Sequence, residues 1–267
     1  MRKLDLYQVD AFAEKLFTGN PAAVMPLQQW LPDGLLQQLA QENNLSETVF
    51  FVPSQKAGVD FDIRWFTPTT EVNLCGHATL AAAWVLLEQL QFHKPEVVFH
   101  SKSGLLRVRR GATGLQMDFP AWPPERLSDY PANLAQLLGV PEILGVYKHR
   151  DWLVEVEKEA WVRQAKPDFQ GLKQLGAMII LTAPGSEADF VSRFFAPGAG
   201  VDEDPVTGSA HSQLVPFWSD KLGKRRLQAR QLSQRGGVIA CELLDNGRVL
   251  LGGNCVFYMK GEVQLPL

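Results

Sequence analysis

The sequence of 267 residues predicts an α+β fold built from two duplicated lobes. Three observations predict it: two similar motif blocks half a chain apart, short strand-like segments throughout, and a helix-like segment that is apolar on every face. We expect each lobe to be a mostly antiparallel, barrel-like sheet around a central α-helix, the two related by a pseudo-twofold axis. The lobes are placed at residues 1–122 and 123–267, and we leave open whether the last strand returns to the N-terminal lobe.

The repeat is the first of these observations. One block reads EVNLCGHA from Glu71, and the other reads EDPVTGSA from Glu203. Their glycines, Gly76 and Gly208, are separated by 208 − 76 = 132 residues, about half the chain. At the same offset, Ser101 and Gly104 recur as Ser233 and Gly236. Identical residues in the same order at one offset indicate duplication rather than coincidence.

Strand-like segments, rich in β-branched and aromatic residues, occur in both halves. They are residues 4–10, 48–52, 60–66, 97–99, 105–109 and 115–118, then 153–156, 177–181, 238–243, 249–252 and 255–258. A helix is predicted over residues 77–90, and its apolar residues cover every face, so we expect it to be buried on all sides. A second helix runs from the other block to about Leu222, where Pro216 is expected to kink it.

The composition excludes several functions. A net charge of −3 without a basic tract gives no electrostatic footprint for nucleic acid or an anionic membrane surface. The longest apolar run, residues 78–87, is too short to span a bilayer. Three widely spaced cysteines predict reduced thiols in a cytoplasm. The chain lacks dinucleotide and phosphate-binding loops and metal-ligand spacings, so we expect neither a cofactor nor a metal.

The repeat places Cys75-Gly76-His77 and Thr207-Gly208-Ser209 at helix N-termini. Unpaired backbone N–H groups and the positive end of the helix dipole attract anions there, and glycine lets a ligand approach the backbone. Two such termini are predicted to hold the carboxylates of a substrate. The alternative is that both glycines only serve tight turns.

Glu47 is the main candidate for acid–base chemistry. It begins a predicted strand and shares a face with Val49 and Phe51 because side chains alternate along a strand. Apolar neighbours raise the pKa of a carboxyl group, which suits proton transfer near neutral pH. The alternative is a glutamate at a strand end that points into water.

Three further residues are candidates. His77 is predicted to be a proton shuttle or hydrogen-bond donor, the alternative being an ordinary core histidine. Asp204, from an acidic cluster that is otherwise a solvated turn, is a candidate to orient an imidazole. Cys75 is a candidate thiolate, since a helix N-terminus lowers the pKa of a thiol. Its counterpart Thr207 is too weak an acid to be the opposing base, which disfavours a two-thiol epimerase.

Long motifs resemble the phenazine-biosynthesis (PhzF-like) isomerase family, which shares the diaminopimelate epimerase-like fold. They are QVDAF from Gln8, GNP from Gly19, NLSET from Asn44, RWFTP from Arg64, CGHA from Cys75 and DPVTGSAH from Asp204. The resemblance covers nearly the whole chain. It implies a homodimer and an active site in the cleft between the lobes. A glutamate at the position of Glu47 moves a proton in the phenazine enzyme, and the positions of His77, Asp204 and Ser209 line that site.

We therefore interpret the chain as a cofactor-independent isomerase acting on a small amino- or hydroxy-carboxylate. Glu47, His77 and Asp204 are assigned to catalysis, while Gly76, Gly208, Ser209, Cys75 and Thr207 are assigned to substrate binding. Two alternatives stay open. One is a proline-racemase-type epimerase or dehydratase that uses Cys75, and the other is a non-catalytic module that binds a small molecule or a protein on the same fold.

Overall fold

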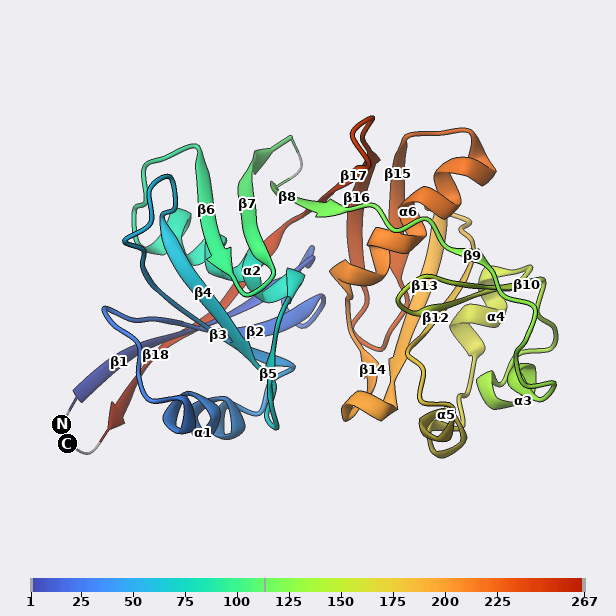
Figure 1. Ribbon diagram of the computed structural model, residues 1–267, viewed down its shortest axis with the longest axis horizontal. Coiled ribbons are helices and arrows are strands. Elements are labelled where there is room, and N and C mark those ends of the chain that lie inside the picture. Colours follow the sequence, from blue (N-terminus) through green and yellow to red (C-terminus); the bar gives the residue numbers. More distant parts are fainter. Residues whose placement is uncertain (1, 113, 266–267) are drawn as a thin grey trace. The chain divides into compact units, whose positions relative to one another are not determined.

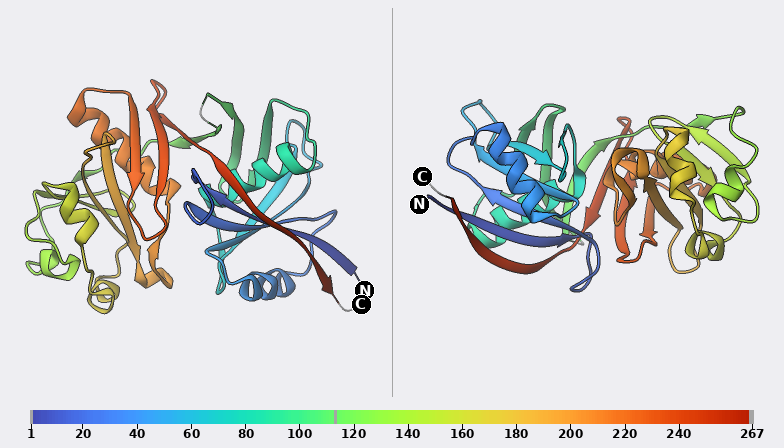
Figure 2. Two further views of the ribbon diagram at one scale, coloured as in Figure 1. Left: turned by 180° about the vertical axis from the view of Figure 1, so that it is seen from behind. Right: turned by 90° about the horizontal axis from the view of Figure 1, so that it is seen from below.

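The computed structural model describes residues 2–112 and 114–265. The chain divides into two compact units (Figure 1). Unit 1 comprises Met1–Asp118 and Gly252–Leu267, and unit 2 comprises Phe119–Leu251. The C-terminal strand β18 (Cys255–Leu265) pairs antiparallel with β1 (Arg2–Ala11), as Figure 2 shows, so it belongs to unit 1.

Unit 1 contains a sheet whose strands pair in a fixed order. β1 pairs antiparallel with β2, β2 parallel with β3, and β3 antiparallel with β4. β4 then pairs antiparallel with β5 and parallel with β6, which pairs antiparallel with β7. The remaining elements of this unit are β2 (Asn20–Pro26), α1 (Asp33–Asn43), β3 (Glu47–Pro53), β4 (Phe61–Phe66), β5 (Glu71–Val72), α2 (Gly76–Trp84), η1 (Val85–Gln89), β6 (Glu96–Ser101), β7 (Gly104–Gly111) and β8 (Gly114–Pro120).

Unit 2 repeats this order of pairing. Strand β10 pairs antiparallel with β11, β11 parallel with β12, and β12 antiparallel with β13. β13 pairs antiparallel with β14 and parallel with β15, which pairs antiparallel with β16. Its elements are β9 (Glu125–Arg126), α3 (Leu134–Leu138), β10 (Gly145–Lys148), β11 (Trp152–Glu155), α4 (Glu159–Gln164), α5 (Phe169–Leu175), β12 (Ile179–Pro184), β13 (Phe190–Ala196), η2 (Pro197–Ala199), β14 (Val201–Asp204), α6 (Gly208–Leu222), β15 (Arg226–Gln231), β16 (Gly237–Leu243) and β17 (Arg248–Gly253).

This matched order confirms the predicted duplication and the α+β class. The sequence patterns missed the strands β2, β10, β13, β14 and β15 and the two-residue strands β5 and β9. β2 carries two prolines and three small or flexible residues, and β15 reads RLQARQ with only Leu227 and Ala229 apolar. Both strands form because neighbouring strands supply their hydrogen-bond partners, which a local pattern does not reveal.

The central helix of unit 1 is buried as expected. Every residue of α2 from Gly76 to Ala83 is buried. The helix packs against β1, β2 and β3. The single helix expected over residues 77–90 changes instead to π-helical geometry at Val85, where the N–H of Leu90 donates to the carbonyl of Val85 at 3.0 Å.

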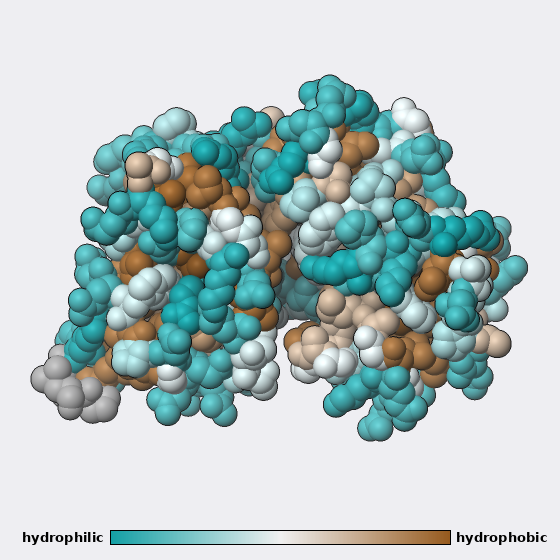
Figure 3. Space-filling model, viewed as in Figure 1, coloured by the Kyte–Doolittle hydropathy of each residue, from teal (hydrophilic) through white to brown (hydrophobic). Residues whose placement is uncertain are grey.

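Strand β3 is buried on both faces because helices cover both. Phe50 and Val52 pack with Leu36 and Leu39 of α1 in one apolar cluster. Glu47 lies on the other face with the buried Val49 and Phe51, toward α2. The outer side of α1 is mostly hydrophilic, as Figure 3 shows.

In unit 2, α6 remains helical through Pro216. Proline has no N–H, so it leaves the carbonyl of Ser212, four residues earlier, without its usual partner. The backbone N–H of Trp122 donates to that carbonyl at 2.8 Å. The proline thus creates an acceptor on α6 that holds the chain at Trp122.

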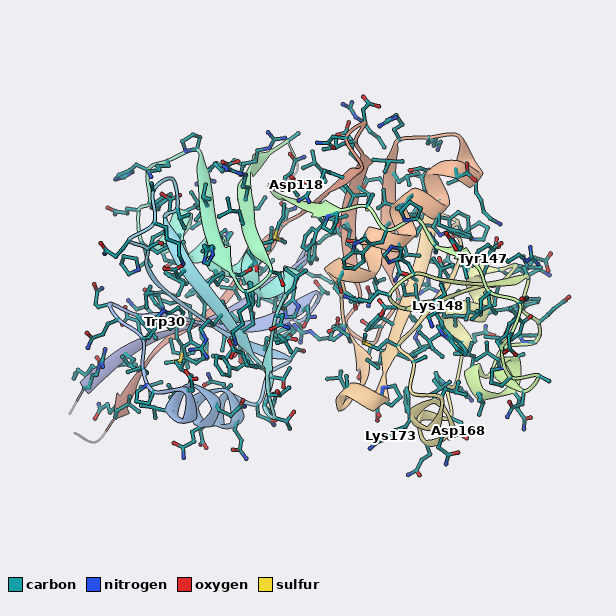
Figure 4. The ribbon with its side chains drawn as sticks, in the orientation of Figure 1. Trp30, Asp118, Tyr147, Lys148, Asp168 and Lys173 are labelled. Carbon is teal, nitrogen blue, oxygen red and sulfur yellow. The ribbon has the colours of Figure 1, made fainter. Side chains whose placement is uncertain are left out.

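The short helix α5 carries exposed charged residues at both ends. Asp168 is its N-cap and accepts from the N–H of Gly171 at 3.1 Å, and Lys173 lies in its last turn (Figure 4). Both charges suit the helix dipole. None of the helices described over residues 2–112 and 114–265 is long and apolar enough to cross a membrane.

Candidate active site

Three candidate residues of unit 1 come together where β2, β3 and the N-terminus of α2 meet. Glu47 is the first residue of β3, Cys75 is the N-cap of α2, and His77 is its second residue. Parallel pairing sets Glu47 beside Ala22 of β2, two residues after Asn20, which begins that strand. The sheet register therefore brings four polar residues from three segments into one place.

The His77 ring makes contact through both nitrogens. Its Nε2 lies 3.1 Å from Glu47 Oε2, although the two groups are not aligned as a regular hydrogen bond. Its Nδ1 lies 3.1 Å from Asn20 Nδ2 and 3.5 Å from Cys75 Sγ. The His77 side chain is 5% exposed and that of Glu47 is 17% exposed, so the carboxylate alone has an appreciable edge toward solvent.

Opposing influences act on the protonation of His77. Burial lowers its pKa, but the electrostatic and hydrogen-bond contributions of the Cys75 sulfur and the Glu47 carboxylate outweigh burial and raise the pKa well above 6.5. The Asn20 amide faces Nδ1 with its N–H₂ group, which instead favours a neutral ring protonated on Nε2. In both states Nε2 carries a proton and faces Glu47.

The thiol of Cys75 does not behave as expected from its place at a helix N-terminus. Burial raises its pKa to about 11, and the nearby charge of Glu47 acts in the same direction. The contributions of His77 and of the N–H of Ala78 lower the pKa but are smaller. The prediction of a lowered thiol pKa is therefore wrong, because the loss of solvent outweighs the helix dipole.

Unit 2 gathers the second set of candidates at the N-terminus of α6. Thr207 is the N-cap, and its hydroxyl donates to Asp204 Oδ2 at 2.5 Å. The buried amide of Gln231 accepts from the N–H of Thr207 at 2.9 Å and donates to the carbonyl of Asp204 at 2.8 Å. Ser209 Oγ accepts from Arg150 Nη2 at 3.0 Å. Asp204, Thr207, Gly208 and Ser209 are thus neighbours, while Gln231 holds the turn.

Both helix N-termini lack a side-chain cap. No side chain of the described residues caps the first turn of α2 or of α6. The Thr207 hydroxyl, which is in the position of a capping group, donates its hydrogen bond to Asp204 instead. Helix N-termini without a side-chain cap meet one condition for anion binding, and the anion site at these two termini stays a prediction.

Glu47, Cys75 and His77 also form a cluster with metal-ligand chemistry, since one ligand atom from each lies within 4.8 Å of the others. To bind a metal, this cluster would have to supply Cys75 as a thiolate and His77 with an unprotonated ring nitrogen. Here the thiol has a pKa of about 11, and Nδ1 and Nε2 face Asn20 and Glu47. The donor set fits proton transfer better than metal coordination.

The sequence predictions missed three residues at these sites. Asn20 lies against the ring of His77, and the Asp204 carboxylate accepts from the Thr207 hydroxyl. The assignment of Asp204 to orienting an imidazole stays a prediction. Gln231 and Arg150 support the N-terminus of α6. Asn20 stands in the GNP motif, so a signal existed for it, but Gln231 and Arg150 have no local motif.

Comparisons with known proteins agree with this architecture. A family model described as "Phenazine biosynthesis-like protein" matches residues 9–261. A protein of Pseudomonas aeruginosa, named an uncharacterized isomerase, is 48% identical over 264 residues, covering 98% of this chain and 100% of that protein. The crystal structure of a PhzF family protein from Enterococcus faecalis matches with a TM-score of 0.93 at 43% identity, covering 99% of this chain and 100% of that one.

A more distant similarity concerns the fold alone. A hydroxyproline epimerase from Agrobacterium vitis matches with a TM-score of 0.64 at 11% identity, covering 98% of this chain and 92% of that one. The duplicated architecture, the matched motifs and the extent of the family match lead to one conclusion. The chain belongs to the phenazine biosynthesis-like protein family, PhzC-PhzF.

Proposed function

We propose that this protein is a cofactor-independent isomerase that moves a proton on a small amino- or hydroxy-carboxylate, with Glu47 as general acid and base. The observation that carries the proposal is the approach of Glu47 Oε2 to His77 Nε2 at 3.1 Å in a largely buried cluster. Membership of a family with relatives named isomerases supports the reaction class.

One carboxylate is sufficient for such a reaction. The ionised Glu47 removes a proton from a carbon next to an electron-withdrawing group, and the electron pair of the broken C–H bond delocalises into that group. The neutral carboxyl then returns the same proton to another carbon of the delocalised system. One C–H bond breaks and another forms, so the reaction needs no oxidant and no second base.

His77 and the helix N-terminus support this step. The Nε2 proton of His77 faces Glu47 in either state of the ring, 3.1 Å from Oε2, so it stabilises the ionised carboxylate electrostatically. The uncapped N–H groups of α2 are positioned to bind a carboxylate or the negative charge that develops on the substrate. Binding and proton transfer are thus proposed to use adjacent groups.

The alternative with Cys75 as base is less well supported. A thiol with a pKa of about 11 is almost fully protonated at neutral pH. The Thr207 hydroxyl, which would have to act as the opposing group in a two-base epimerase, donates to Asp204 and is far less acidic than a thiol.

The test is proton exchange in heavy water, followed by NMR, for carboxylate metabolites that raise the melting temperature of the protein. Glu47→Gln keeps the shape of the side chain but cannot carry a proton, so we expect exchange to fall by about 10²–10⁴. Cys75→Ser is the matched control and should retain most of the exchange.

Two outcomes would contradict the proposal. Exchange that survives in Glu47→Gln but is lost in Cys75→Ser would make the thiol the base. Tight binding of a metabolite to the wild-type protein, with no exchange of any of its protons, would favour the non-catalytic binding module.

The homodimer implied by the family resemblance is also a proposal. Unit 1 exposes apolar side chains on β18 and beside it, with Phe17 67% exposed and Tyr258 46% exposed. The rings of Phe17 and Tyr258 lie 6.2 Å apart, which makes an exposed aromatic pair of the kind found at interfaces. Light scattering on wild-type protein and on Phe17→Ser/Tyr258→Ser tests this, and a monomeric wild type would exclude it.

A further inference from the structure

We infer that Arg150, together with Ser209 and the N-terminus of α6, binds a carboxylate of the substrate and selects ligands that carry a full negative charge. This inference rests on the proposed function and extends it to a residue that no motif marks. All the groups involved belong to unit 2.

The guanidinium of Arg150 is held on one side only. Its Nε lies 2.9 Å and 3.0 Å from the two carboxylate oxygens of Asp151, and its Nη2 donates to Asp151 Oδ2 at 2.5 Å. Nη2 also donates to Ser209 Oγ at 3.0 Å. Among the contacts of the described residues none involves Nη1, and the side chain is 35% exposed. One edge of a fixed cation therefore remains available beside Ser209.

A buried network fixes the carboxylate that anchors Arg150. The side chain of Asp151 is completely buried and accepts from Gln213 Nε2 of α6 at 3.1 Å. The same Gln213 amide accepts from the N–H of His149 at 3.1 Å. The loop between β10 and β11 is thus tied to α6, and Arg150 is tied to the loop.

The guanidinium of Arg150 packs against a stacked aromatic pair, Trp122 and His149. The carbon Cζ of Arg150 lies 5.2 Å from the centre of the Trp122 ring, and the His149 ring stacks on Trp122 with centres 5.7 Å apart. Trp122 is itself fixed by its hydrogen bond to the Ser212 carbonyl that Pro216 leaves free. A planar guanidinium held this way loses little entropy when it binds a carboxylate.

The groups around Arg150 are hydrogen-bond donors that suit an anionic ligand. The Ser209 hydroxyl accepts from Arg150, so its own proton is available to a ligand. The first turn of α6 has no side-chain cap. An ion pair with Asp151 alone would require neither the exposed edge of the guanidinium nor its hydrogen bond to Ser209. A carboxylate satisfies all three sets of donors at once.

The experiment titrates succinate and its neutral analogue succinamide into the full-length protein and follows the backbone amide signals of Ser209 and Ala210 by NMR. We expect saturable shifts with succinate only. The variant Arg150→Gln/Asp151→Asn removes both charges together, so it leaves no buried carboxylate without a partner. It should weaken succinate binding by about tenfold or more, whereas Arg150→Lys should retain an intermediate affinity.

Three results would overturn the inference. They are the absence of succinate-dependent shifts at Ser209 in the wild type, equal shifts with succinamide, and an unchanged succinate affinity in the folded double variant. Arg226→Gln, which removes an exposed arginine of the same unit that pairs with Glu242, serves as the matched control and should bind succinate like the wild type. Because the readout is binding, a failure here is distinct from a failure of the exchange assay that tests the proposed reaction.

Discussion

Thr79 and His211 occupy the same position in the two units and make the same contact. Thr79 Oγ1 donates to the carbonyl of Cys75 at 2.6 Å, and His211 Nδ1 lies 2.8 Å from the carbonyl of Thr207. Each acceptor is the N-cap residue four positions earlier, and both side chains are fully buried. Both copies of the helix start therefore have the same side-chain contact with the N-cap carbonyl. Unit 1 makes it with a hydroxyl, which does not titrate near neutral pH, and unit 2 makes it with an imidazole, a titratable group.

This relationship predicts acid sensitivity in unit 2. Burial lowers the pKa of His211 to about 4, and the hydrogen bond to Thr207 offsets this only in part. The unfolded chain takes up a proton near pH 6.5 and the folded protein only near pH 4, so stability falls as the pH decreases between these values. The expected loss is about 3 kcal/mol. His211→Thr copies the contact of unit 1 and should remove this part of the pH dependence in urea unfolding, and an unchanged slope would contradict the assignment.

His77 should act in the opposite direction and in a different pH range. Its pKa in the folded protein is raised well above 6.5, with burial opposed by the contributions of the Cys75 sulfur and the Glu47 carboxylate. Its contribution to stability is thus complete below about pH 6.5 and is lost as the pH rises through the raised value. Urea unfolding of the wild type and His77→Asn at increasing pH should show the difference in unfolding free energy shrinking. A difference that grows with pH would exclude a stabilised imidazolium.

Asn20 is predicted to position His77. Asn20→Leu removes the contact with Nδ1, so the ring loses its orientation and proton exchange should fall by roughly tenfold. Asn20→Asp places an acceptor opposite Nδ1, which favours the imidazolium and should move the NMR titration of the His77 ring to higher pH. A purely structural role would lower the melting temperature without moving that titration.

Cys75 is predicted to be an unreactive thiol. With a pKa of about 11 and 7% of the residue exposed, it should react slowly with iodoacetamide at neutral pH, and the rate should increase up to about pH 11. Peptide mapping by mass spectrometry assigns the modified cysteine, and urea-unfolded protein provides the control. Rapid alkylation of Cys75 in the folded protein at pH 7 would restore the thiolate mechanism.

A site residue could be predicted when its role depends on neighbours in the sequence, and not when its role depends on a residue far away in the chain. Gly76 and Gly208 could be found because each starts a helix after a short motif, and the repeat relates the two motifs. The burial of α2 was visible in its composition, since all its faces are apolar. Arg150 was missed because its role depends on Ser209, which is 59 residues away in the sequence.

The sequence alone determined the duplication, the α+β class and the candidates for a reactive role, because these depend on local patterns and on one repeated offset. Only the tertiary structure decided how those residues interact. The parallel pairing of β2 with β3 brings Asn20 and Glu47 to the two nitrogens of His77. Burial, which depends on the whole unit, makes Cys75 a weak acid at a helix terminus where it was a candidate thiolate. The cost of removing a charge from water depends on everything packed around it, and no short segment of sequence contains that information.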